Sequence, residues 1–158
     1  MGSKKMSPDN KVKVQFRVDP DDQRGVKTES LWAEMVGPGQ FRILNSPFFL
    51  FGINADDVVE AEETNNGLEF RAVVSRGGHS TYRIFLQDGR TTKYPDFRIG
   101  WKAISELGAT FENADDHFVA VDIPPGRDVA AIYELMAKGE RDGIWAFEEV
   151  YYAGQRTQ

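Results

Sequence analysis

The sequence predicts an α+β protein: a β-rich subdomain over residues 11–80, followed by a subdomain of mixed strands and helices over residues 81–152. In the first part, short apolar–polar alternations recur between tight turns, as in a small antiparallel β-barrel or rolled sheet. In the second, apolar residues recur at helical spacing in two segments. The predicted order there is strand, helix, strand, strand, helix, strand, which is the ferredoxin-like βαββαβ arrangement.

Five segments of the first subdomain are predicted strands. Residues 11–18 alternate cleanly, with Phe16 and three valines on one face and charged or amide side chains on the other. In the second strand, Trp32 is expected on the face opposite Leu31, Ala33 and Met35. An Asn-Asn-Gly sequence at residues 65–67 predicts a hairpin turn, because these residues tolerate a positive φ. The later strands are expected over residues 30–36, 40–44, 57–63 and 68–74.

Two helices are predicted in the second subdomain. Asp96 is the expected N-cap of the first, which Gly108 ends, and Asp128 is the expected N-cap of the second, which Gly139 follows. Strands are predicted over residues 82–86, 109–112, 118–123 and 144–152. Each helix carries an apolar stripe that is expected to be core: Trp101, Ile104 and Leu107 in the first, and Val129, Ile132 and Met136 in the second.

Composition narrows the possible functions. The 158-residue chain contains no cysteine, which excludes disulfides, thiol catalysis and cysteine-bound zinc and favours a reducing cytoplasm. No apolar run approaches the length of a membrane-spanning helix, so no membrane association is expected. The net charge of −6 argues against nucleic-acid binding and is compatible with a basic protein partner. No cofactor motif is present.

The chain ends are predicted to be tails. Residues 1–10 are polar and are expected to be disordered, and residues 153–158 form a short C-terminal tail. The first residues lack the apolar core of a signal peptide. Gly2 and Ser3 before a second methionine resemble a cloning remnant, with the natural start near Met6.

The candidate site lies in residues 41–81, which contain the longest apolar run of the chain and a glycine-rich loop around a histidine. Polar residues at strand ends are held by the sheet while their loops stay accessible, so Asn45, Asp57 and His79 are expected to converge. Within the apolar run, Phe48 and Phe51 are expected in the core. The predicted ligand- or partner-binding residues are Asn45, Phe49, Asp57, Glu60, Arg76, His79 and Ser80.

His79 admits several roles. With a carboxylate and a hydroxyl it could activate a nucleophile, but the surrounding glycines form no hydrolase-type elbow. It could instead order the turn through backbone bonds, or contact a ligand or partner. The amides of residues 76–81 could also cradle a phosphate, although no lysine or following helix supports this. The spacing of the two histidines does not predict a metal site.

Four sequence clusters resemble one known family. They are Ser-Leu-Trp-Ala-Glu at residues 30–34, Arg-Ile-Leu-Asn-Ser-Pro-Phe-Phe at 42–49, Asp-Asp-Val-Val-Glu-Ala at 56–61 and Gly-His-Ser-Thr at 78–81. Together they resemble a bacterial family described only as a domain of unknown function, number 4265. The resemblance covers about residues 30–152. It supports the fold boundaries and the choice of site, and it implies no activity.

Three functions are therefore weighed. The first is a small acidic cytoplasmic binding or regulatory protein that contacts another protein, as an inhibitor or immunity protein does, and turns nothing over. The second is an enzyme or small-ligand binder that uses the His79 loop. The third is an acidic mimic of nucleic acid that docks on a basic protein.

Overall fold

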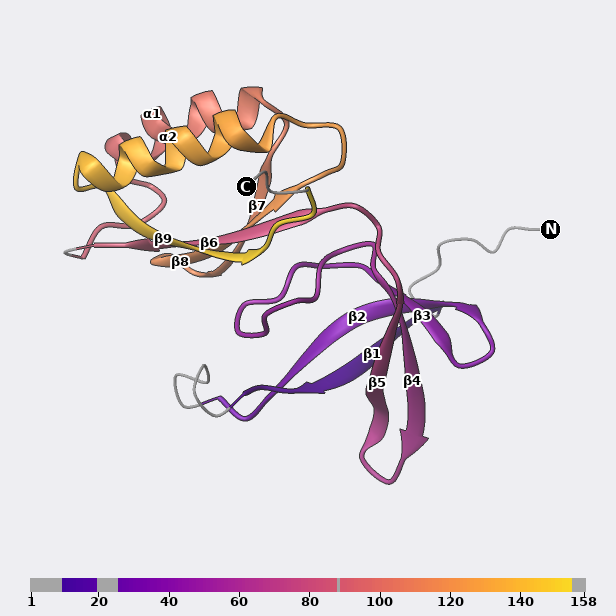
Figure 1. The fold of residues 1–158 in the computed structure, drawn as a ribbon. Helices are drawn as coiled ribbons and strands as arrows, with labels where there is room; N and C mark the ends of the chain where they lie inside the picture. Colours follow the sequence, from indigo (N-terminus) through magenta and orange to yellow (C-terminus); the bar gives the residue numbers. More distant parts are fainter. Residues whose placement is uncertain (1–9, 20–25, 88, 155–158) are drawn as a thin grey trace. The chain divides into compact units, whose positions relative to one another are not determined.

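The computed structural model describes residues 10–19, 26–87 and 89–154. The tails expected over residues 1–9 and 155–158, and most of the loop after the first strand, lie outside this part of the chain. The chain divides into two compact units, Met1–Gly77 and Gly78–Gln158. The described residues are mostly β, with two helices and two sheets (Figure 1).

The first unit is a meander of five strands. Consecutive strands pair antiparallel. A short parallel pairing, Val14 with Leu68 and Gln15 with Glu69, joins the last strand to the first and closes the pairing order. The predicted Asn-Asn-Gly turn joins the last two strands, and Gly67 has the positive φ of 100° that this turn requires. The strands are β1 (Lys11–Arg17), β2 (Thr28–Gly37), β3 (Gln40–Ile43), β4 (Val58–Thr64) and β5 (Gly67–Ser75).

Strand alternation builds the core of the first unit. Alternate residues of each strand face inward, and two residues of the loop between β3 and β4, Leu50 and Ile53, complete the same core. Met35 lies near the end of β2, and its side chain is 62% exposed. A bulge between Met35 and Gly37 shifts the register of β2 against β3 there. The inward-facing strand residues are Val14, Phe16, Leu31, Ala33, Phe41, Ile43, Val59 and Ala61.

The second unit has the predicted order of elements. Its four strands form an antiparallel sheet in the order β7-β8-β6-β9. Figure 1 shows both helices on one face of this sheet. The elements are β6 (Ser80–Leu86), α1 (Pro95–Glu106), β7 (Thr110–Asp115), β8 (Phe118–Ile123), α2 (Val129–Arg141) and β9 (Trp145–Tyr151).

Trp145 lies at the centre of the second core and is fully buried. Its indole nitrogen donates to the Met136 carbonyl at 2.9 Å, and its ring meets Phe97 edge to face. A Cβ on Gly139 would lie 2.3 Å from the indole, so only glycine lets α2 approach this closely. Glycine is therefore a packing requirement here, inside α2, and the prediction that it follows the helix is wrong.

The two helix starts differ. Asp128 caps α2 as predicted, because its carboxylate accepts from the Ala131 amide at 3.0 Å. The prediction that Asp96 caps α1 is wrong. The cap position is Tyr94, Pro95 takes the first helical position, and Asp96 lies inside the first turn. Proline suits that position because its fixed φ matches the helix and its missing N–H is not needed there.

The helices of the second unit are short. In the described part of the chain, no helix is long and apolar enough to cross a membrane.

Candidate functional site

The loop over residues 44–57, between β3 and β4, is held inside the first unit by two buried carboxylates. The first belongs to Glu29 at the start of β2, where it lies on the inward-facing side of the strand. Its two oxygens accept from the backbone amides of Phe48, Phe49 and Leu50 at 2.6, 3.0 and 3.0 Å. Three consecutive N–H groups thus form an anion nest that the protein fills with its own carboxylate. The nest is already occupied and is not a ligand site.

The second carboxylate belongs to Asp57, which has no exposed surface. It accepts from the backbone and side-chain amides of Asn54 at 2.9 and 3.2 Å and from the Gly77 amide at 3.0 Å. Arg76 forms an ion pair with it at 3.0 Å and also donates to the Gly52 carbonyl at 2.6 Å. Asp57 therefore ties the loop end to the segment that follows β5, and its side chain cannot reach a partner.

Gly77 is needed for this closure. A Cβ at that position would lie 2.5 Å from the carbonyl oxygen of Asp56, far inside van der Waals contact. Asp56 itself has a positive φ of 70°, which residues other than glycine seldom adopt. The strained turn at Asp56 and the tight approach of Gly77 persist because the Asp57 carboxylate bonds both segments.

The loop over residues 44–57, which we call the clamped loop, presents an aromatic side chain. The Phe51 side chain is 40% exposed, so the expectation that it belongs to the core is wrong. Phe48, also expected in the core, is half-buried, and Phe49 is half-buried and packs against the core. The course of the loop backbone leaves Phe51 exposed. Leu50 and Ile53 take the inward positions, and Gly52 between Phe51 and Ile53 has a positive φ of 84°.

The other predicted residues of the first unit lie in this loop or on β4. The side-chain oxygen of Asn45 accepts from the Trp32 amide at 2.9 Å, so Asn45 continues the bonding of β2 beyond the end of β3. Glu60 is exposed on β4. Trp32 is 45% exposed, as its position in the alternation predicts, and the Lys13 ammonium lies 4.8 Å from its ring centre.

The predicted residues of the second unit lie at the start of β6. His79 Nδ1 is 2.7 Å from a carboxylate oxygen of Asp122, and Nδ1 is the donor because an ionised carboxylate can only accept. Ser80 is buried, and its hydroxyl oxygen accepts from the Ala153 amide at 3.0 Å. A histidine–carboxylate pair is thus built at this strand end. Its carboxylate comes from β8, which the sequence did not suggest.

The structure brings together part of the predicted site. Asp57 and Arg76 are bonded within the first unit, and His79 and Ser80 are neighbours in the second. Asn45 and Asp57 belong to the first unit and His79 to the second. Their three-way convergence stays a prediction.

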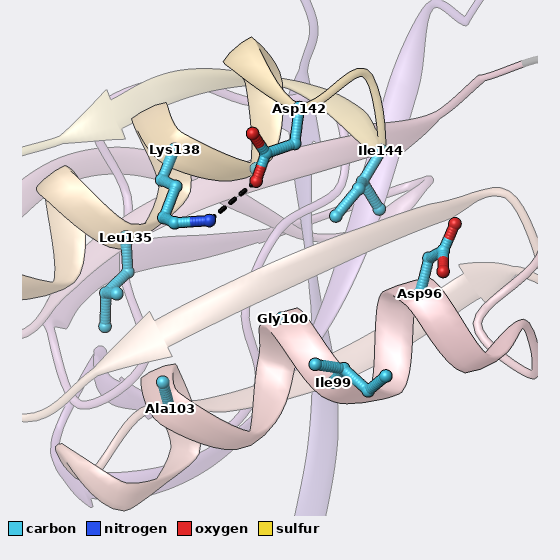
Figure 2. A pocket seen from close by; sticks show the side chains of 9 residues that line it. Asp96, Ile99, Gly100, Ala103, Leu135, Lys138, Asp142 and Ile144 are labelled. Atoms are coloured by element: carbon cyan, nitrogen blue, oxygen red, sulfur yellow. Dashed lines mark hydrogen bonds and ion pairs between the residues drawn. The ribbon is translucent and has the colours of Figure 1, made fainter.

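A second candidate surface is a groove of about 270 Å³ between α1 and α2 (Figure 2). Its walls are mostly apolar, and Ile99 in α1 is 73% exposed. Lys138 in α2 and Asp142, the residue just after it, form an ion pair at its rim. The remaining lining residues are Asp96, Gly100, Ala103, Leu135, Gly139 and Ile144.

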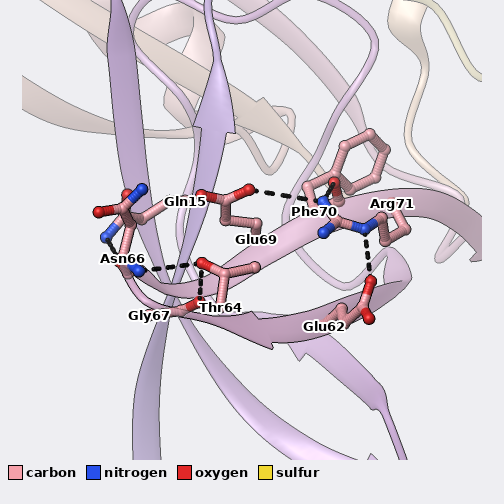
Figure 3. A network of polar contacts seen from close by, with 8 residues as sticks. All are labelled: Gln15, Glu62, Thr64, Asn66, Gly67, Glu69, Phe70 and Arg71. Carbon is pink, nitrogen blue, oxygen red and sulfur yellow. Dashed lines mark hydrogen bonds and ion pairs between the residues drawn. The ribbon is translucent and has the colours of Figure 1, made fainter.

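A third surface is a cleft of about 420 Å³ beside β1 and β5. Figure 3 shows the polar network that borders it. Arg71 donates to Glu62 at 2.9 Å and forms a second ion pair with Glu69. The hydrogen bond that Arg71 donates to Glu62 is the main cause that raises the pKa of Arg71 above its ordinary value. Gln15 donates to the Asn66 carbonyl across the same opening.

Across residues 10–19, 26–87 and 89–154, no group of three or more histidine or carboxylate side chains is arranged to hold a metal ion.

Sequence reasoning missed the residue that organises the clamped loop. Glu29 precedes an alternating strand and resembles any solvent-facing glutamate at a strand end. Its parity with Leu31 and Ala33 was the available signal, because a charged residue in an inward position needs a bonded partner. The Asp122 carboxylate gave no comparable signal.

These features define an α+β protein of two units whose first unit carries a carboxylate-clamped aromatic loop. A family model described as "Domain of unknown function (DUF4265)" matches residues 29–147, and the chain belongs to that family. The search of curated proteins found no match.

A solved structure shares the fold. It is described as a "Novel crystal structure of a hypothetical protein from Neisseria gonorrhoeae", and the match has a TM-score of 0.75 and 20% sequence identity. The match covers 92% of this chain and 96% of that one. At this identity the similarity concerns the fold alone.

Proposed function

We propose that this protein is a binding module that acts by protein–protein contact, as inhibitor and immunity proteins do, and that it turns nothing over. The clamped loop is the contact element, with Phe51 as its anchor and Phe49 beside it. Exposed aromatic side chains are frequent anchors of protein interfaces because they bury a large apolar area with few rotatable bonds.

The carrying observation is that one buried carboxylate, Glu29, binds three consecutive loop amides. A loop ordered before binding loses little further entropy when a partner docks, so more of the contact energy appears as affinity. A purely structural role would not explain the exposure of Phe51. A loop that served only to close the core would be expected to bury that ring. The loop instead buries Leu50 and Ile53 and leaves Phe51 40% exposed.

Charge supports a basic partner. Glu60 and Glu62 lie two residues apart on β4, and both are exposed. Attraction between opposite charges speeds the encounter of two proteins and weakens as salt rises. The same acidic row would serve the alternative of a nucleic-acid mimic, in which it occupies the DNA- or RNA-binding surface of the partner.

The proposal includes a finer description of the fold and its setting. We regard the first unit as a small five-stranded barrel, which the closed pairing order supports. We regard the second as a ferredoxin-like unit, which the sheet order and the one-sided helices support. A cytoplasmic location is proposed from the absence of cysteine.

A second candidate function rests on the His79–Asp122 pair. A carboxylate that holds Nδ1 orients the imidazole, as in general-base catalysis. Ser80, the next residue in the sequence, lines a cavity of about 380 Å³ with residues before and within α2. This arrangement would suit an enzyme or a small-ligand binder.

Quantitative capture tests the proposal. The full chain, the variant Phe51→Ala and the control Tyr94→Ala are immobilised and exposed to lysate of cells that encode the chain. Tyr94 is 46% exposed in the other unit, so its loss removes a similar area from an unrelated surface. We expect one protein to be retained equally by wild type and Tyr94→Ala and at least about tenfold less by Phe51→Ala, the loss of a hot-spot residue.

Two results would contradict the proposal. One is equal retention of every bound protein by Phe51→Ala and wild type. The other is turnover of a phosphoester, ester or glycoside by the purified chain that His79→Ala abolishes at an unchanged melting temperature. That result would show that the protein is an enzyme and would contradict its assignment as a binding module.

A further inference from the structure

The seam between β1 and β5 is the weakest closure of the first unit. Seven residue pairs join β1 to β2, but only two join β1 to β5. The next residues in this register, Phe16 and Phe70, do not pair through their backbones, and their rings stack instead at 4.8 Å. The cleft of about 420 Å³ opens here, and the half-buried Phe70, backed by the buried Phe16, forms its aromatic floor.

The walls of this cleft are polar and come from four segments. Gln15 and Arg17 project from the same face of β1, and Thr28 is the strand partner of Arg17 on β2. Asn66 contributes from the β4–β5 turn, and Glu69 from β5. An aromatic floor with a few converging polar groups, at this volume, is the usual composition of a small-molecule site.

The two arginines that line the cleft, Arg17 and Arg71, differ in their ion pairs. Arg71 is held by Glu62 and Glu69, and it also donates to the Phe70 carbonyl (Figure 3). Those two carboxylates neutralise its charge. Within the described ranges, no carboxylate forms an ion pair with Arg17. The cleft therefore combines a stacked aromatic floor with one guanidinium available at its rim.

We propose that this cleft binds a small aromatic anion. Its ring packs on Phe70, which the buried Phe16 supports from behind, and its anionic group pairs with Arg17 beside the Thr28 hydroxyl. Guanidinium recognises a carboxylate or sulfonate with two parallel N–H bonds, which fixes the orientation of the ring as well as its affinity. This site is separate from the contact proposed for the clamped loop and does not depend on it.

Two matched probes test the proposal on the full chain. One is 8-anilinonaphthalene-1-sulfonate, and the other is N-phenyl-1-naphthylamine, which has the same rings without the sulfonate. Fluorescence titration gives both dissociation constants for wild type and for Arg17→Gln, Phe70→Ala and Ile99→Ala. Ile99 is the control, because it lines the groove between the helices.

We expect wild type to bind the sulfonate about tenfold more tightly than the neutral probe, as one charge-assisted hydrogen-bonded pair provides. Arg17→Gln should remove that preference and leave the affinity for the neutral probe unchanged. Phe70→Ala should weaken both probes, and Ile99→Ala should change neither. Amide NMR shifts on titration should concentrate in residues 15–17 and 66–71.

Equal affinities of wild type for the two probes would overturn the proposal. So would a sulfonate preference that survives in Arg17→Gln, since this exposed substitution leaves the core intact. Probe binding that Ile99→Ala abolishes, or shifts centred on α1 and α2, would assign the ligand to the other groove and would equally overturn it.

Discussion

The two units solve the same packing problem by different means. The first has no α-helix in its described residues, and it closes its core with an irregular loop that two buried carboxylates hold by its backbone amides. The second covers its sheet with two helices and fills the interface with aromatic rings around Trp145. A helix satisfies its own backbone, whereas a buried loop must find partners for every amide. Polar clamps therefore appear where helices do not.

The largest expected effect tests the apolar half of this comparison. Trp145→Ala should lower the free energy of unfolding by about 4 kcal/mol, because it opens a cavity against α2 and removes the bond to the Met136 carbonyl. Chemical denaturation followed by fluorescence and circular dichroism measures it. The matched control is Trp32→Ala, which removes a side chain that is 45% exposed and should cost below about 1 kcal/mol. Similar costs for both would refute the central role of Trp145.

The next effect tests the polar half. Asp57→Ala should cost about 3 kcal/mol, since it leaves the Gly77 amide and the amide groups of Asn54 without their acceptor inside the protein. Glu60→Ala, three residues away on an exposed position of β4, should change the stability by less than about 0.5 kcal/mol. If the two variants unfold at the same denaturant concentration, Asp57 is not a clamp.

These two cases show what the sequence could and could not predict. Alternation and helical spacing predicted every strand and both helices to within a few residues, because periodicity reflects which face is buried. The Asp128 cap and the Asn-Asn-Gly turn were predictable for the same local reason. The partners of Glu29 and Asp122 were not, because Glu29 meets amides about twenty residues away and Asp122 meets a histidine 43 residues away. Such distant pairings leave no period.

A smaller effect is expected at the strand end that carries His79. His79→Ala should leave the fold intact and lower stability by about 1 kcal/mol, the value of one partly buried hydrogen bond. Its effect on affinity for the partner should be only a modest factor. His117→Ala is the control, because this histidine is exposed in the turn before β8. The melting temperatures of both variants are compared with that of the wild type. Complete unfolding of His79→Ala would contradict this prediction and show that the His79–Asp122 pair is essential for the fold.

The smallest effect concerns the acidic row of β4. Reversal of Glu60, Glu62 and Glu63 to lysine should slow association with a basic partner severalfold at low salt and leave dissociation nearly unchanged. Stopped-flow or surface-plasmon measurements at two salt concentrations separate the two rates. Because Glu62 holds Arg71, Glu62→Gln serves as a control for that local contact. An association rate independent of both salt and charge would exclude electrostatic attraction by this row.

The most direct test of the account concerns the amides of Phe48, Phe49 and Leu50. If the Glu29 carboxylate clamps the loop, amide hydrogen exchange by NMR should show these three protons protected to a degree similar to the paired strands. Glu29→Gln should make all three exchange at least about tenfold faster, because one amide oxygen cannot replace a carboxylate that accepts three bonds. Exchange in α2 should stay unchanged and serves as the internal control. Rapid exchange of the three amides in the wild-type protein would contradict the clamp and, with it, the preorganised contact loop.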